Sequence, residues 1–132
     1  MTQTIASLKP FEAERDTSSP NRNLAPITTA LDGEDRLLIG GCLLSELAQR
    51  YGTPLYVLDE DTVRGTCRAY RDALQQHYPG TSLPVYASKA NSSLLMSSIA
   101  AAEGLGLDAV SAGELLTCLL YTSDAADELS CV

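Results

Sequence analysis

Three short, largely apolar runs, each followed by a stretch with helical periodicity, constrain the fold of this chain most strongly. The runs are residues 55–58, 83–88 and 107–110. The first, Leu-Tyr-Val-Leu, is apolar throughout, which is typical of a strand buried on both faces of a sheet. Because strands and helices alternate, the connections should be right-handed crossovers between parallel strands, in a barrel or an open sheet. The sequence therefore predicts an α/β fold with about three strand–helix units.

The segment before residue 55 divides into two parts. Residues 1–33 are rich in Thr, Ser, Pro, Asn and charged residues without hydrophobic periodicity, so we predict a disordered leader. A transit peptide is the less favoured interpretation, because such peptides avoid the acidic residues that occur here. Residues 36–39 predict a short strand, and the periodicity of residues 43–51 predicts a helix that ends at Gly52.

The residues after the first apolar run predict a helix that begins at Asp59 and ends at Pro79-Gly80. Asp59 can cap this helix, while Glu60 and Asp61 complement the positive end of its dipole. We prefer this explanation of the three carboxylates to a metal or acid–base site. The arginines on the less apolar side are interpreted as a solvated face rather than a phosphate site: Arg64, Arg68 and Arg71.

The composition and charge of the chain argue against nucleic acid and membrane as partners. The 132 residues carry a formal net charge of −8, which argues against a nucleic-acid surface, since such a surface needs clustered Lys and Arg. No apolar run approaches the roughly 20 residues of a membrane helix, and no signal peptide is recognisable. We therefore expect a cytoplasmic protein that acts on a small molecule and binds neither nucleic acid nor membrane.

The cysteines do not predict a metal site. The chain has 4 cysteines and 1 histidine, without a Cys-x-x-Cys pair. A structural zinc site needs about four ligands in compact spacing, so we expect no metal. Cys42 and Cys67 fall on predicted buried faces and are interpreted as reduced core residues. His77, near the end of the predicted helix, is interpreted as a surface residue.

The candidate reactive group is Lys89, one of two lysines in the chain. It follows the predicted strand 83–88, and catalytic side chains of parallel α/β folds project from the carboxyl ends of strands. Strict alternation would put Val85, Ala87 and Lys89 on one side of that strand. A partly desolvated amine on such an apolar face would be a good nucleophile for Schiff-base chemistry. The alternative is an ordinary surface lysine.

Two sequence blocks connect this lysine to a known family. The first is Tyr86-Ala87-Ser88-Lys89-Ala90-Asn91, and the second is residues 104–115, Gly-Leu-Gly-Leu-Asp-Ala-Val-Ser-Ala-Gly-Glu-Leu. At this spacing they resemble the start of the barrel in the diaminopimelate decarboxylase family of pyridoxal-phosphate enzymes, which has the alanine-racemase-like fold (fold type III). The resemblance begins near Ile39-Gly40-Gly41 and fades after Leu116 or Thr117.

The resemblance implies that residues 34–117 form the start of a pyridoxal-phosphate-binding (β/α)₈ barrel, with its preceding strand and helix. It implies that Lys89 holds pyridoxal 5′-phosphate as a Schiff base, and that the enzyme converts meso-2,6-diaminopimelate to L-lysine and CO₂. Asp108 would be a second catalytic residue, which positions Lys89 and tunes its protonation. The implied cofactor-binding positions are Lys89, Ala87, Asp108, Ser111 and Glu114. The complete protein would be a homodimer.

These assignments have alternatives. Asp108 could be a strand-end capping carboxylate, and alternation leaves open whether it or Leu107 faces inward. Ser111 with Glu114 three residues later is also the signature of a helix capping box. The functional alternatives are a decarboxylase of the same fold that acts on ornithine, arginine or carboxynorspermidine, and a non-catalytic protein that binds pyridoxal phosphate.

The final segment, residues 118–132, does not continue the family pattern. Residues 118–128, Cys-Leu-Leu-Tyr-Thr-Ser-Asp-Ala-Ala-Asp-Glu, resemble one translation frame of a transposon adapter used in sequencing libraries. We therefore predict that residues 118–132 are a non-native tail; the alternative is an ordinary helix followed by a polar tail. Because a complete barrel takes roughly 250 residues, we expect this chain to be an inactive and marginally folded amino-terminal fragment.

Overall fold

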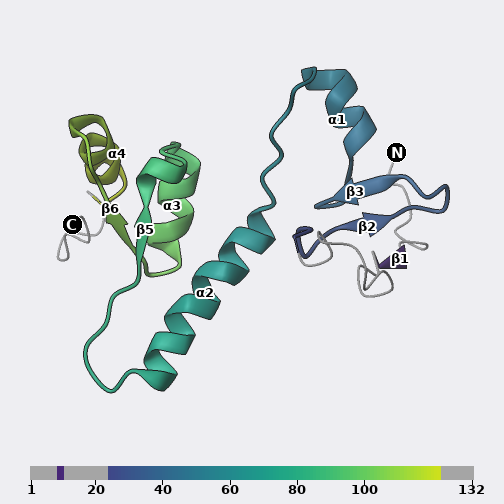
Figure 1. The fold of residues 1–132 in the computed structure, drawn as a ribbon. Helices are drawn as coiled ribbons and strands as arrows, with labels where there is room; N and C mark the ends of the chain where they lie inside the picture. Colours follow the sequence, from purple (N-terminus) through teal and green to yellow (C-terminus); the bar gives the residue numbers. More distant parts are fainter. Residues whose placement is uncertain (1–8, 11–23, 123–132) are drawn as a thin grey trace. The chain divides into compact units, whose positions relative to one another are not determined.

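The computed structural model describes residues 9–10 and 24–122, and Figure 1 shows them as a ribbon. The chain divides into two compact units, Met1–Thr62 and Val63–Val132. The boundary falls in the first turn of the long helix α2, Glu60–His77. The predicted α/β class is confirmed, because strands and helices alternate in the second unit.

The first unit is a small antiparallel sheet followed by a helix. Its strands are ordered β1-β2-β3-β4, and each pairs with its neighbour. The elements are β1 (Lys9–Pro10), β2 (Ala30–Leu31), β3 (Leu37–Ile39), β4 (Cys42–Leu43) and α1 (Leu44–Tyr51). Gly40 and Gly41 have φ angles of 57° and 74°, so the turn between β3 and β4 favours glycine at both positions. The strand and helix predicted here are confirmed, and the helix ends at Gly52.

Part of the predicted disordered leader is ordered instead. Within residues 24–33, Ala30 and Leu31 form β2 and pair with Leu38 and Leu37 of β3. A two-residue strand is too short to show a hydrophobic period, which is why its composition pointed to disorder. Residues 1–8 and 11–23 of the predicted leader lie outside the described residues.

One of the two predicted core cysteines is buried. Cys67 on α2 lies in the core, and burial raises the pKa of its thiol. Cys42 on β4 is exposed, so its predicted burial is wrong; β4 is a short edge strand of the sheet, and little covers it. Both thiols are free, as expected.

The apolar run 55–58 is not a strand, although the sequence predicts one. It is irregular chain between α1 and α2, and its side chains are exposed, with Tyr56 completely so. Apolar composition favours a strand only where a neighbouring strand and a packing surface exist, and none of the described residues pairs with this run. The described chain after residue 55 therefore has two strand–helix units rather than three.

The buried carboxylate of Asp59 joins the sheet of the first unit to the start of α2. Its Oδ2 accepts a hydrogen bond from the Thr62 backbone N–H at 3.1 Å, which confirms the predicted cap. Its Oδ1 accepts from the Thr28 hydroxyl at 2.8 Å, and that hydroxyl accepts from the Gly40 N–H at 2.8 Å. Burial alone would raise the pKa of Asp59, but the hydrogen bonds from Thr62 and Thr28 outweigh it and lower the pKa.

The arginines of α2 are not the solvated face that the sequence predicts. They bind the end of helix α3, Leu94–Ala102. Arg64 and Arg68 lie 2.9 and 2.7 Å from the Glu103 carboxylate, whose side chain is only 7% exposed, and Arg71 donates to the Glu103 carbonyl at 2.9 Å. Helical periodicity shows which side of a helix is polar, but not that a carboxylate from another helix meets that side.

Helix α3 ends as predicted at Gly104, in a Schellman turn. Gly104 has a φ of 80°, its N–H donates to the Ala101 carbonyl at 3.0 Å, and the Leu105 N–H donates to the Ala100 carbonyl at 2.9 Å. The turn folds Leu105 back against α3 and leads the chain into the next strand.

The start and the buried face of α3 differ from the prediction. The cap is Ser93, whose Oγ accepts from the Met96 N–H at 3.4 Å, rather than Asn91 or Ser92. The buried apolar residues are Met96, Ile99 and Ala100, whereas Leu95 and Ala102 of the predicted stripe are exposed. Ile99 belongs to both the predicted and the observed face, and Met96 and Ala100 are buried beside it in place of Leu95 and Ala102.

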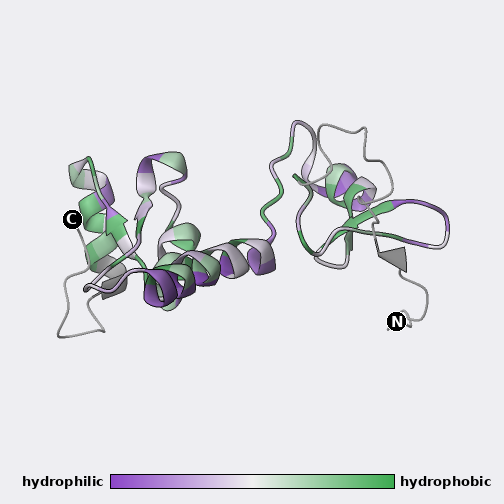
Figure 2. Ribbon diagram, turned by 60° about the horizontal axis from the view of Figure 1, so that its bottom comes forward, coloured by the Kyte–Doolittle hydropathy of each residue, from purple (hydrophilic) through white to green (hydrophobic). Residues whose placement is uncertain are grey.

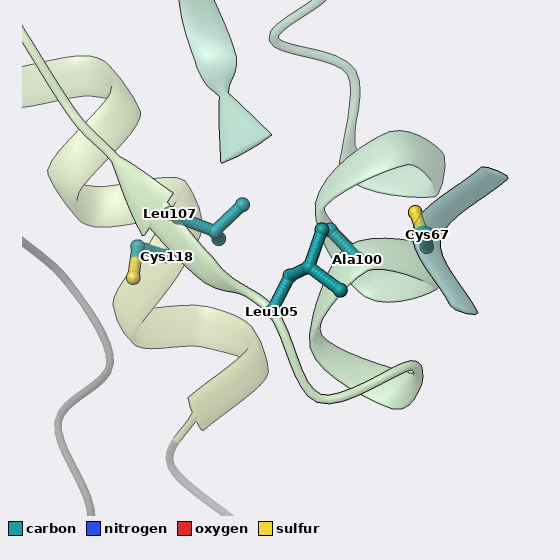
Figure 3. Packing of buried hydrophobic residues seen from close by; sticks show 5 residues of the cluster. All are labelled: Cys67, Ala100, Leu105, Leu107 and Cys118. Atoms are coloured by element: carbon teal, nitrogen blue, oxygen red, sulfur yellow. The ribbon is translucent and has the colours of Figure 1, made fainter. Parts of the chain in front are cut away.

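The core of the second unit lies between a parallel strand pair and its helices. As predicted, β5 (Val85–Ala87) and β6 (Gly106–Asp108) are parallel, with Tyr86 opposite Leu107. Leu107 is buried with residues of α2, of α3 and its final turn, and of α4 (Ala112–Thr122); Figure 3 shows them as Cys67, Ala100, Leu105 and Cys118. Tyr86 packs against this cluster, so the helices cover one face of the strand pair.

Hydropathy follows this packing. Figure 2 shows mostly hydrophobic residues on α4 and a mixture of hydrophilic and hydrophobic residues along α2. None of the helices in residues 24–122 is both long and apolar enough to span a membrane. In the same part of the chain, no group of three or more His, Cys, Asp or Glu side chains is arranged to hold a metal ion.

Candidate active site

The two parallel strands end side by side, with Ala87 and Asp108 as their last residues. These two are register partners, so their side chains share one face of the pair. The preceding partners, Tyr86 and Leu107, face the helix-covered core. Ala87 and Asp108 therefore face the opposite side, which decides the orientation of Asp108 that the sequence leaves open.

Lys89 follows β5 but is not part of it. The strand ends at Ala87, and Ser88–Ala90 form the 3₁₀ turn η1. The predicted alternation therefore stops before Lys89 and does not put it on the face of Val85 and Ala87. Lys89 is exposed, so the partial desolvation expected from the sequence is not found. The turn continues the strand directly, which leaves Lys89 at the carboxyl edge of the pair.

Two side-chain hydrogen bonds fix the segment that carries Lys89, residues 86–91, which we call the lysine turn. The Ser88 hydroxyl donates to the Asp108 carbonyl oxygen at 2.6 Å. The Tyr86 hydroxyl donates to the Asn91 carbonyl oxygen at 3.1 Å, from one side of Lys89 to the other. Burial raises the pKa of the Tyr86 phenol, which keeps this donor protonated. Sequence reasoning misses both bonds; the one available signal is a serine at the end of an apolar run.

Ser111 and Glu114 lie at the start of α4, beyond the end of β6. The Ser111 hydroxyl accepts from the Glu114 N–H at 3.2 Å, and the Glu114 carboxylate accepts from the Val110 N–H at 2.7 Å. This reciprocal arrangement is close to a capping box, so it supports the structural alternative for the pair. Their part in binding a cofactor stays a prediction.

A small depression lies beside the strand ends. Hydroxyl groups from several elements contribute to its lining: Ser88, Ser92, Ser97 and Thr117. Glu114 is the only predicted site residue that lines it, together with Leu107 of the core face. The structure thus brings Ala87, Lys89 and Asp108 to one edge, but within residues 24–122 it does not join them with Ser111 and Glu114 in one pocket.

The charged groups at this edge define its chemistry. Among residues 24–122, neither the Lys89 amine nor the Asp108 carboxylate has a hydrogen-bond or ion-pair partner. An accessible amine can add to an electrophilic carbon, and a nearby carboxylate can orient that amine or accept a proton. The edge therefore carries an exposed amine, on the turn after β5, and a carboxylate at the end of β6.

Comparisons with known proteins place the chain in a family. The family described as "Pyridoxal-dependent decarboxylase, pyridoxal binding domain" matches residues 60–128, more than half of the 132 residues. The chain is 52% identical to a diaminopimelate decarboxylase of Synechocystis sp. over 99 aligned residues. These residues cover 75% of this chain and 21% of that protein. It is 45% identical over 94 residues to that of Bacillus methanolicus, at 70% and 21% coverage.

A solved structure agrees with these matches. The crystal structure of a diaminopimelate decarboxylase from M. jannaschi superposes with a TM-score of 0.59 at 33% identity, and the alignment covers 72% of this chain and 22% of that one. The chain spans about a fifth of the length of these relatives. The resemblance carried by the two sequence blocks is thereby confirmed. Because the match includes the strand pair, the lysine turn and their helices, this chain belongs to the pyridoxal-dependent decarboxylase family, in its pyridoxal binding domain.

Proposed function

We propose that this chain is part of a pyridoxal-phosphate-dependent decarboxylase that converts meso-2,6-diaminopimelate to L-lysine and CO₂. The observation that carries the proposal is the carboxyl edge of β5 and β6, where an exposed amine on the lysine turn follows one strand and a carboxylate ends the other. The relatives, which are diaminopimelate decarboxylases, support the substrate. Because this chain spans about a fifth of them, we assign the activity to the complete protein.

The residues at the edge fit an aldehyde cofactor in three respects. Covalent attachment needs an amine that the aldehyde can reach, and Lys89 is exposed. A carboxylate that orients this amine must not be held by another group, and the Asp108 carboxylate has no hydrogen-bond or ion-pair partner among residues 24–122. Ala87 shares the face of Asp108 and leaves room for a flat ring because its side chain is a single methyl group.

Each predicted site residue has a proposed role. Lys89 would hold the cofactor covalently, and Asp108 would orient the Lys89 amine and exchange a proton with it. Ala87 would lie against the ring. Ser111 and Glu114 would approach the cofactor from the start of α4, in addition to capping that helix. When bound, pyridoxal phosphate supplies the electron sink that accepts the electron pair of the broken carbon–carbon bond.

The test is the release of CO₂ by the complete protein, expressed from the uninterrupted gene. We expect release from meso-2,6-diaminopimelate and none above background from ornithine, arginine or carboxynorspermidine. A Lys89→Arg variant keeps a positive charge but cannot attach the aldehyde in the same way, so it should release none. Release from one of the other substrates would replace the proposed substrate. Cofactor binding without release from any of them would favour a non-catalytic binding protein.

The cellular setting is a further part of the proposal. We expect a homodimer in the cytoplasm that acts on a small molecule, and the net charge of −8 supports the expectation that nucleic acid is not a partner. Analytical ultracentrifugation of the complete protein would test the dimer, and a monomer at micromolar concentration would contradict it.

A further inference from the structure

The lysine turn is tied to β6 at one point and closed on itself at another. The tie is the hydrogen bond from the Ser88 hydroxyl to the Asp108 carbonyl oxygen at 2.6 Å. The closure is the bond from the Tyr86 hydroxyl to the Asn91 carbonyl oxygen at 3.1 Å, and the Asn91 N–H adds a third bond to the Ser88 carbonyl at 3.1 Å. In the sequence, Lys89 lies between Tyr86 and Ser88 on one side and Asn91 on the other.

The hydrogen bond made by Ser88 is partly shielded from water. Ser88 is 4% exposed and Asp108 is half-buried, so this bond is less readily exchanged for one to solvent than an exposed bond would be. Tyr86 is anchored separately, because its ring packs against the core cluster while its hydroxyl reaches over the turn. The backbone on both sides of Lys89 is therefore held by side chains that themselves cannot move freely, whereas the Lys89 side chain is exposed.

We propose that Ser88 and Tyr86 are positioning residues, whose hydroxyl groups hold the backbone of Lys89 at the end of β6, at a fixed place relative to Asp108. The inference rests on the proposed function, because it concerns the attachment of pyridoxal phosphate to Lys89. Neither hydroxyl is hydrogen-bonded to the Lys89 amine, because the one donates to Asp108 and the other to Asn91. Each restricts the conformations that the turn can adopt, so the amine meets a bound aldehyde in a favourable orientation more often.

The rate of attachment measures this positioning. The Lys89 nitrogen adds to the aldehyde carbon, a carbon–nitrogen double bond replaces the carbon–oxygen bond, and the oxygen leaves as water. Borohydride then delivers a hydride to that carbon and makes the link permanent. The cofactor-free complete protein is mixed with pyridoxal phosphate and quenched with borohydride after set times, and the labelled Lys89 peptide is quantified by mass spectrometry.

The variants and their control differ by single hydroxyl groups. Ser88→Ala should slow the attachment about tenfold, and Tyr86→Phe about threefold, because the bond of Tyr86 is the less buried one. Ser88→Thr keeps the hydroxyl and should restore the rate to within about twofold of the original. The matched control is Ser98→Ala, whose hydroxyl donates to the Leu95 carbonyl at 2.8 Å within α3, away from the turn; its rate should not change.

A second aldehyde separates positioning from simple reactivity of the amine. Formaldehyde is small and is not held by the protein, so its borohydride-dependent methylation of Lys89 should proceed equally in all variants. The inference is overturned if Ser88→Ala attaches pyridoxal phosphate at the original rate. It is also overturned if Ser88→Ala slows the methylation of Lys89 by formaldehyde as much as it slows the attachment of pyridoxal phosphate. If Ser88→Ala does not fold, as judged by circular dichroism, Tyr86→Phe and Ser88→Thr decide the question. Absence of label on Lys89 in the original protein would overturn the proposed function itself, and with it this inference.

Discussion

The Glu103 carboxylate accepts two hydrogen bonds from the Arg68 guanidinium, at 2.7 and 2.8 Å, one on each oxygen. This bidentate geometry is the strongest form of ion pair available to a carboxylate, and Arg64 adds a third bond at 2.9 Å. Cys67, the neighbour of Arg68, lies in the core. Charge on one side and apolar packing on the other thus fix α2 against the end of α3.

The arginine contact makes the stability of the second unit sensitive to acid. Hydrogen bonds from Arg68 and Arg64 lower the pKa of Glu103 from 4.5 to about 2. The Glu103 carboxylate therefore binds a proton more readily in the unfolded chain than in the folded one. Its contribution to the free energy of unfolding is complete above about pH 4.5 and is lost as the pH falls toward 2. Urea midpoints measured between pH 7 and pH 2 by circular dichroism should show this loss.

A substitution isolates the contribution of Glu103. Glu103→Gln should have a lower urea midpoint than the original protein. The difference between the two midpoints should be largest at neutral pH and should shrink as the pH falls toward 2. The exposed carboxylate of Glu46 is the control, and Glu46→Gln should cost less than about 0.5 kcal/mol at neutral pH. A difference between Glu103→Gln and the original protein that stayed constant with pH would contradict the ion-pair account.

Replacing Asp59 tests the junction of the sheet with α2. Asp59→Ala removes the helix cap and leaves the Thr28 hydroxyl without its acceptor, so it should lower the free energy of unfolding by about 1–2 kcal/mol. Asp61→Ala, an exposed change in the same first turn, should cost less than about 0.5 kcal/mol. The measurement is urea unfolding of both variants, and equal midpoints for them would show that Asp59 is not the cap.

The parts of the fold that could be predicted are those with a local cause. Gly52 and Gly104 end helices because a positive φ angle is needed there, and Asp59 caps α2 because its side chain reaches the first turn. The run 55–58 shows the limit, since its apolar residues look like a strand but the partner that would make it one is not among the described residues. The role of Arg68 shows the same limit, because Glu103 lies 35 residues away in the sequence.

In the candidate site, too, features with a local cause could be predicted and features that depend on distant contacts could not. The parallel pairing puts Ala87 and Asp108 at one edge, as the alternation of strands and helices predicts. The exposure of Lys89 could not be predicted, because the strand stops at Ala87 and a 3₁₀ turn replaces the expected alternation. The bond from Ser88 to Asp108 depends on where that turn lies over β6, which no local pattern encodes.

Ser111 has two proposed roles, and its substitution can separate them. Ser111→Ala should lower the free energy of unfolding by about 1 kcal/mol, because it removes the acceptor for the Glu114 N–H. Ser111→Asp keeps an acceptor at this position and should retain most of the stability. Both variants should bind pyridoxal phosphate more weakly in the complete protein, as measured by equilibrium dialysis. Unchanged binding in Ser111→Asp would reduce the role of Ser111 to that of a cap.

The origin of residues 118–132 is a prediction about the gene. Helix α4 continues through Thr122 with Cys118 buried, and the family match extends to residue 128. Continuity of a helix does not depend on origin, since the leucines that follow Cys118 favour helix in any sequence. We expect genomic DNA across this locus to depart from the present sequence after Thr117. A genomic read that reproduces residues 118–128 would contradict the non-native tail.

The attachment of pyridoxal phosphate to Lys89 is the claim on which the rest depends, and one measurement tests it directly. The complete protein is incubated with pyridoxal phosphate, reduced with borohydride and digested, and the labelled peptide is sequenced by mass spectrometry. The account predicts a label on Lys89, at the carboxyl edge beside Asp108, and its loss in Lys89→Arg. A label on another residue, or undiminished labelling of Lys89→Arg, would contradict it.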